Sequence, residues 1–141
     1  MTTGSPVCTF GDVNSTITVE QAHDQRLYDL MVEAAGAHRQ VERAEGLVMF
    51  RAERLGVIRR VHTSREAYCV DRVTGERASV ADAIVLAGPA AAAAQPWRAD
   101  EWAQATEALD AARITLTEAR QAIRTHEQHY TGWSRFFLVT S

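Results

Sequence analysis

The chain has 141 residues, of which 46% are hydrophobic, and this size and composition favour one globular domain over a disordered segment. A net charge of −3 argues against a general nucleic-acid binder with a broad basic face. We expect no signal peptide, and the longest apolar run, residues 83–94, is too short and too rich in alanine to cross a membrane. Two distant cysteines form no disulfide framework, so we expect a cytoplasmic protein.

The first long element in chain order is a helix over residues 18–55. It follows an irregular stretch in which residues 7–10 have the pattern of a short strand. Thr18 and Gln21 have the spacing of a capping box at the start of this helix. Gly56 suits its end, because glycine adopts the left-handed conformation that often follows the last helical turn.

Residues 57–95 are predicted to form a small α/β insert between two long helices. Residues 57–61 are short, apolar and β-branched, and residues 66–73 alternate well enough for a second strand. Thr74 and Gly75 then signal a turn.

The second half of this insert is predicted to contain a short helix. Ser79 and Asp82 have the spacing of a helix cap, and the pair Gly88 and Pro89 should end the helix. The alanine-rich residues 90–95 are interpreted either as a linker or as a frayed helical turn.

The second long helix is predicted over residues 97–130. Gly132 suits its C-terminal cap, and residues 133–139 have the pattern of a strand. A strand this close to the helix end would lie near the N-terminal segment of an antiparallel hairpin.

Both long helices carry an apolar stripe with alternating steps of three and four residues, which is typical of helices that pack along one face. In an antiparallel pairing of the two stripes, Val41 lies opposite Leu116, and Leu55 lies opposite Trp102. We therefore expect a mainly α fold with minor β structure. It would be a single domain, residues 1–141, built as a long antiparallel helical hairpin with a strand and turn insert at its tip and short terminal strands.

The densest aromatic cluster lies in the segment Tyr-x-Gly-Trp-x-Arg-Phe-Phe-Leu-Val-x-Ser, residues 130–141. This segment resembles one in uncharacterised proteins of actinobacteria, their plasmids and their phages, where it leads into His and Cys pairs of a zinc-like module. The resemblance implies either the N-terminal part of a longer protein, which we favour, or a naturally short relative. The chain stops at Ser141, before the His and Cys residues of that module. None of the metal ligands of the module therefore has an equivalent in this sequence, and we expect no cofactor in this chain.

Three histidines and one cysteine are weak candidates for a metal site. An antiparallel hairpin would bring His23 and His126 to the same end, with His129 nearby and Cys8 in the preceding segment. Imidazole and thiolate groups suit a transition metal. The alternative, which we favour, is a set of polar residues that are hydrogen-bonded at the end of the helices.

The local basic excess at the hairpin tip includes Arg54, Arg59 and Arg60. These residues are weak candidates for contacts with nucleic-acid phosphates. Glu53 and Glu66 reduce the net positive charge of this region, so nucleic acid is a possible partner that we do not favour.

Five aromatic residues are candidates for contact with a protein partner. Trp97 and Trp102 flank the start of the second helix, where they would form a partner site or, as we favour, cover the core at the tip. Trp133, Phe136 and Phe137 belong to the aromatic cluster near the end of the chain.

These patterns favour a non-enzymatic helical module for interaction or dimerisation, which would position the missing zinc-like domain. The expected partner is a second copy of the chain or another protein, and we expect no association with a membrane. Cys69 with His62 upstream lacks the third group and the oxyanion motif of a nucleophilic site, so an enzyme is not favoured. The alternative function is a nucleic-acid-binding protein of a mobile element or phage, with arginines at the hairpin tip.

Overall fold

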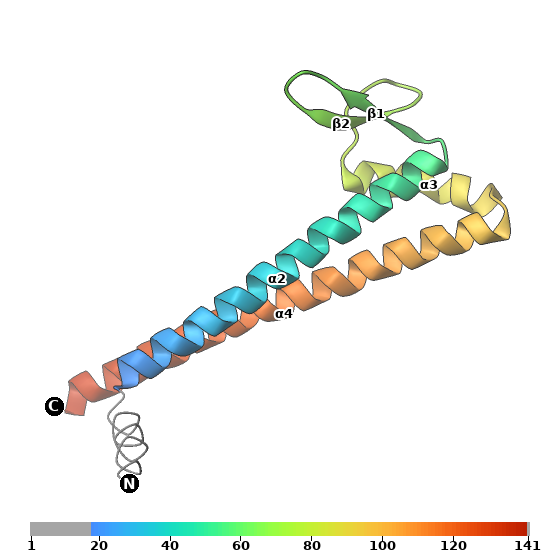
Figure 1. The fold of residues 1–141 in the computed structure, drawn as a ribbon. Coiled ribbons are helices and arrows are strands. Elements are labelled where there is room, and N and C mark those ends of the chain that lie inside the picture. The colour runs from blue at the N-terminus through green and yellow to red at the C-terminus, as the bar shows by residue number, and fades with distance from the viewer. Residues whose placement is uncertain (1–17, 141) are drawn as a thin grey trace, which may run out of the picture. The chain divides into compact units, whose positions relative to one another are not determined.

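The computed structural model describes the backbone of residues 18–140 and the side chains of residues 18–129. The described part is mainly helical with one small antiparallel sheet, as predicted (Figure 1). In chain order its elements are α2 (Val19–Arg54), β1 (Ile58–His62), β2 (Ala67–Asp71), α3 (Val80–Ala93) and α4 (Pro96–Thr140). The strand expected at residues 7–10 lies outside the described residues.

The chain divides into two compact units. The central unit is Ala35–Glu118, and the terminal unit comprises the described residues of Met1–Ala34 and Ala119–Ser141. Each unit contains a segment of α2 and a segment of α4, and each is described separately below.

In the central unit, the segments of α2 and α4 run antiparallel. Arg51 forms an ion pair with Glu101 at 3.1 Å. Earlier in α2, Glu45 pairs with a residue later in α4, Arg113, at 3.6 Å. This opposite progression along the two helices confirms the predicted antiparallel pairing in this unit.

The core of the central unit contains the apolar stripes that the heptad pattern predicted. Val48 and Leu109 are fully buried, and Val41 and Leu116 are each 8% exposed. Small residues share this core, among them Ala37, Ala52 and Ala105. Alanines at such positions allow two helix axes to approach closely.

Glycine ends α2 where the sequence predicted it. Gly56 has a positive φ of 81°. Its amide donates to the carbonyl of Glu53, and the amide of Val57 donates to the carbonyl of Ala52. These two bonds form a Schellman motif, which satisfies carbonyls that the helix end leaves without partners.

The two strands of the insert form an antiparallel hairpin in which Arg59 pairs with Val70 and Arg60 pairs with Cys69. Thr63 shapes the turn between the strands, because its hydroxyl accepts from the amides of Arg65 and Glu66. The predicted pair of strands is therefore present, with β1 shifted by one residue and β2 shorter than predicted.

A capping box opens α3, as the sequence predicted. The Ser79 hydroxyl accepts from the amide of Asp82, and the Asp82 carboxylate accepts from the amide of Ser79. The predicted end at Gly88 and Pro89 is wrong, because α3 continues through Pro89 to Ala93.

The reason for this continuation lies on the inward face of α3. Ala83, Ala87 and Ala91 are buried at a spacing of four residues. Burial of Ala91 beyond Pro89 stabilises the last turn, which offsets the hydrogen bond that proline cannot donate. The residues predicted as a linker or frayed turn are therefore mostly helical.

The predicted end of the second long helix is also wrong. α4 begins at Pro96, a residue type favoured in the first helical turn, and it continues past Gly132 to Thr140. The strand predicted at 133–139 is therefore helical. A strand needs a neighbour for its backbone groups, whereas a helix pairs them within the segment. Among the described residues, β1 and β2 pair with each other and the sheet contains no third strand.

In the terminal unit, α2 begins with the predicted capping box. The amide of Thr18 donates to the Gln21 side chain at 2.9 Å, and the amide of Gln21 donates to the Thr18 hydroxyl at 3.0 Å. Leu30 is buried at 3% exposure, and His23 is buried at 9%. These two residues define the inner face of α2 in this unit.

Candidate functional site

The surface that stands out is an apolar stretch of α2 in the terminal unit. Tyr28, Met31 and Val32 are 65%, 56% and 51% exposed. They are spaced by three and four residues, so they lie on one side of the helix. We call these three residues the outer face of α2.

Helical geometry explains why this face points away from the core. Two residues along an α-helix correspond to a rotation of about 200°. Tyr28 and Val32 are each two residues from buried Leu30, so their side chains lie on the opposite side of α2.

Asp24, an exposed acidic residue four positions before Tyr28, continues this side of α2 toward the N-terminus of the helix. It forms no ion pair with another described residue. The terminal unit therefore presents an apolar patch with a carboxylate at its N-terminal side.

The imidazoles of His23 and His126 lie together, as the sequence predicted. The two rings stack with centroids 4.5 Å apart and an angle of 10° between their planes. Nε2 of His126 lies 3.1 Å from the carbonyl oxygen of His23, and Nε2 of His23 lies 3.3 Å from the Glu127 carboxylate. His129 is exposed.

This arrangement resembles packed polar residues more than a metal centre. Within residues 18–129, no group of three or more His, Cys, Asp or Glu residues has a metal-binding arrangement. Cys8, the remaining candidate ligand, lies outside the described residues.

The arginines predicted at the tip do not form one patch. Arg59 and Arg60 are neighbours on β1, so their side chains point to opposite sides of the hairpin. Arg60 pairs with Glu53 at 3.6 Å. Arg54 is exposed, and its backbone carbonyl accepts from the Arg98 side chain at 3.0 Å.

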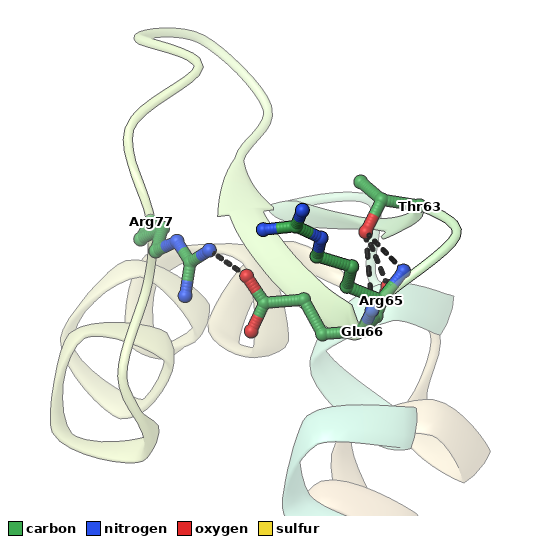
Figure 2. A network of polar contacts seen from close by, with 4 residues as sticks. All are labelled: Thr63, Arg65, Glu66 and Arg77. Atoms are coloured by element: carbon green, nitrogen blue, oxygen red, sulfur yellow. Dashed lines mark hydrogen bonds and ion pairs between the residues drawn. The ribbon is translucent and has the colours of Figure 1, made fainter.

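Figure 2 shows a polar network around the turn of the hairpin. Arg77 donates to the carboxylate of Glu66, and its guanidinium lies 4.0 Å from the centre of the Tyr68 ring. The hydrogen bond with Glu66 raises the pKa of Arg77. Arg65 lies in the same turn, is exposed, and forms no ion pair within the described part of the chain.

A cavity of about 250 Å³ lies between this network and α3. Two of its three carboxylates support local structure. Asp71 accepts from the amides of Val73 and Thr74, and Asp82 caps α3. The hydrogen bonds to Ser79 hold the pKa of Asp82 below its ordinary value.

The two described tryptophan side chains have different environments. Trp102 is 9% exposed and belongs to the core, whereas Trp97 is 49% exposed. Trp97 donates from its indole nitrogen to the Gln95 side chain at 3.1 Å. Trp133, Phe136 and Phe137 lie in α4 beyond the described side chains.

Comparisons with protein-family models, with curated proteins and with solved structures find no match to this chain. Among the described residues, neither long helix has an apolar stretch sufficient to cross a membrane.

Sequence reasoning did not single out the outer face of α2. The signal was present, because Tyr28, Met31 and Val32 are large apolar residues outside the heptad stripe. Apolar positions at a helical spacing that differs from the main stripe indicate a second apolar face.

Proposed function

We propose that this chain is a non-enzymatic helical interaction module, and that the outer face of α2 is its docking surface. The observation that carries the proposal is the exposure of Tyr28, Met31 and Val32, each of which is more than half exposed. Contiguous apolar residues of this size on a helix favour binding to another protein, because burying them removes apolar area from water.

The distribution of apolar residues in the terminal unit supports this proposal. Among the described residues of this unit, Leu30 is the one buried hydrophobic residue, whereas Val19, Tyr28, Met31 and Val32 are exposed. The central unit shows the opposite balance, with a core that draws on α2, β1, β2, α3 and α4. Among the residues of the terminal unit whose side chains the structure describes, more large apolar side chains are exposed than buried.

The residue types of the outer face also suit an interface. Tyrosine combines a large apolar ring with a hydroxyl that hydrogen-bonds at a wet rim, and methionine adapts its shape to a partner. Both types are enriched at protein interfaces. In this proposal the module works in the cytoplasm and positions a following domain with His and Cys ligands, as the resemblance of residues 130–141 implies.

A photo-reactive phenylalanine analogue at Val32 tests the proposal in cells that express the full chain. We expect one discrete cross-linked adduct, which becomes weaker when Tyr28 and Met31 are changed to Ser and Gln. The matched control places the analogue at Gln40, which is exposed on another side of α2. Equal labelling at the two positions, or no adduct at Val32, would contradict the proposal.

We propose nucleic-acid binding as the second candidate function. It is supported by Arg59 and Arg65, which are exposed and form no ion pair within residues 18–129. Phosphate contacts weaken as salt concentration rises, because binding releases counterions. A gel-shift series at low and moderate salt with the R59E/R65E variant tests this candidate, and an unchanged shift in the variant would exclude these residues.

A further inference from the structure

We propose that the partner of the outer face of α2 is an amphipathic helix of another protein, whose apolar side is flanked by lysine or arginine residues. This inference rests on the proposed function and adds the chemistry of the partner. It uses residues of the terminal unit alone, because Val19 to Glu33 form one continuous stretch of α2 within that unit.

Carboxylates border the outer face of α2 toward the N-terminus of the helix. Asp24 lies one turn before Tyr28 and seven positions before Met31, so it lies on nearly the same side of the helix as both residues. Glu20 lies four positions before Asp24 and continues the same row. Both acidic residues are exposed, and neither forms an ion pair among the described residues.

A third carboxylate borders the flank of this face that Val32 forms. Asp29 lies three positions before Val32, is exposed, and accepts a hydrogen bond from the Gln25 side chain at 3.2 Å. The one arginine of α2 in this unit is Arg26, which is two positions from Tyr28 and therefore points to the other side of the helix. The charges that α2 places around its outer face in this unit are therefore all negative.

The stability of the helix itself does not account for all of these carboxylates. A carboxylate in the first helical turn interacts favourably with the helix dipole, and Glu20 lies in that turn. The effect falls off beyond the first turn, whereas Asp24 and Asp29 lie further along α2. Negative charge around exposed apolar residues instead suits a partner of opposite charge, because complementary charges steer association and select among partners.

The spacing of the outer face favours a helix as the occupant. Tyr28, Met31 and Val32 are separated by the steps of three and four residues that form the ridges by which one helix packs into the grooves of another. From Glu20 to Val32 the bordered face extends about 18 Å, which a partner helix of about twelve residues covers. A second copy of the same face is disfavoured, because it offers further carboxylates and no cation to pair with them. The same repulsion disfavours a nucleic acid at this face.

Two synthetic helical peptides of about five turns test this partner chemistry with the full chain. Both carry leucine at steps of three and four residues, and the positions that flank the leucines are lysine in one peptide and glutamate in the other. Fluorescence anisotropy should show that the lysine peptide binds at low salt and more weakly at moderate salt, and that the glutamate peptide does not bind. D24K should raise the dissociation constant of the lysine peptide about five- to tenfold, because a modest attraction becomes a repulsion.

The matched control is E33K, the same charge reversal at an exposed residue that is rotated about 140° from Tyr28 around α2. At moderate salt it should leave the affinity for the lysine peptide unchanged, and circular dichroism should show wild-type helix content for both variants. The inference is overturned if the lysine peptide does not bind, if the glutamate peptide binds equally well, or if D24K and E33K weaken binding equally. Failure of the lysine peptide while the Val32 analogue still labels another protein would refute the basic helix and leave the proposed function standing. The absence of any adduct would refute both.

Discussion

The packing of Leu109 allows the stability of the central unit to be tested quantitatively. This side chain is fully buried in α4, in a core that also contains Ala37 and Ala105. Leu109→Ala removes three carbon atoms, which at about 0.8 kcal/mol each represents about 2.4 kcal/mol of transfer free energy. The cavity adds to this loss. Because Ala105, one turn earlier on α4, has no side-chain rotamer with which to fill the space, we expect a total of about 3–4 kcal/mol.

Urea unfolding followed by far-UV circular dichroism measures this loss, and Ile114→Ala provides the matched control. Ile114 lies on the same helix and is 61% exposed. Its truncation should change the free energy of unfolding by no more than about 0.5 kcal/mol, as for other surface substitutions. If both variants lose the same free energy, or if Leu109→Ala is as stable as the wild type, the assignment of the buried face of α4 is incorrect.

Three further predictions concern helix ends and interiors. Gly56→Ala should destabilise the protein by about 1 kcal/mol or more, because Gly56 has φ of 81° in the turn after α2; a thermal midpoint equal to that of the wild type would contradict this. Gly46→Ala should have the opposite sign and stabilise α2 by up to about 1 kcal/mol, because apart from its chain neighbours and the backbone of α2 itself no atom lies within 4 Å of the added methyl position; a lower midpoint would show a contact that the structure lacks. Asp82→Asn should weaken the cap of α3 at neutral pH. Because the pKa of Asp82 is depressed in the folded state, its stabilising effect is complete above the ordinary value of 3.8 and is lost as the pH falls through the lower folded-state pKa. The difference in midpoint between wild type and variant should therefore shrink in acid, and a difference that does not depend on pH would exclude the carboxylate as its source.

Local signals predicted the helix boundaries that depend on local chemistry. The capping boxes at Thr18 and Ser79 and the C-terminal cap at Gly56 each need only a few neighbouring residues, so the sequence contains enough information to place them. The pairing of the long helices in the central unit was also predictable, because a repeated apolar stripe on two helices of similar length favours one antiparallel arrangement.

The errors occurred where distant contacts decide the outcome. Pro89 ends a helix by local rules, yet burial of Ala91 stabilises the turn that follows it. The apolar run at residues 136–139 contributed to the prediction of a strand, but a strand depends on a neighbour that local sequence does not specify. The outer face of α2 was missed for a related reason, since residues outside the main stripe look like ordinary surface until the burial of Leu30 fixes which side faces inward.

The two faces of α2 help to explain why association and helix packing would reinforce each other. In the terminal unit the inner face buries Leu30 and the stacked imidazole of His23, which removes little apolar area from water. The larger side chains Tyr28, Met31 and Val32 lie on the other side of the same helical turns. A protein partner that covers them would stabilise these turns from outside. Because a partner that binds only the folded form stabilises it by mass action, we expect binding at the outer face of α2 to stabilise these helical turns.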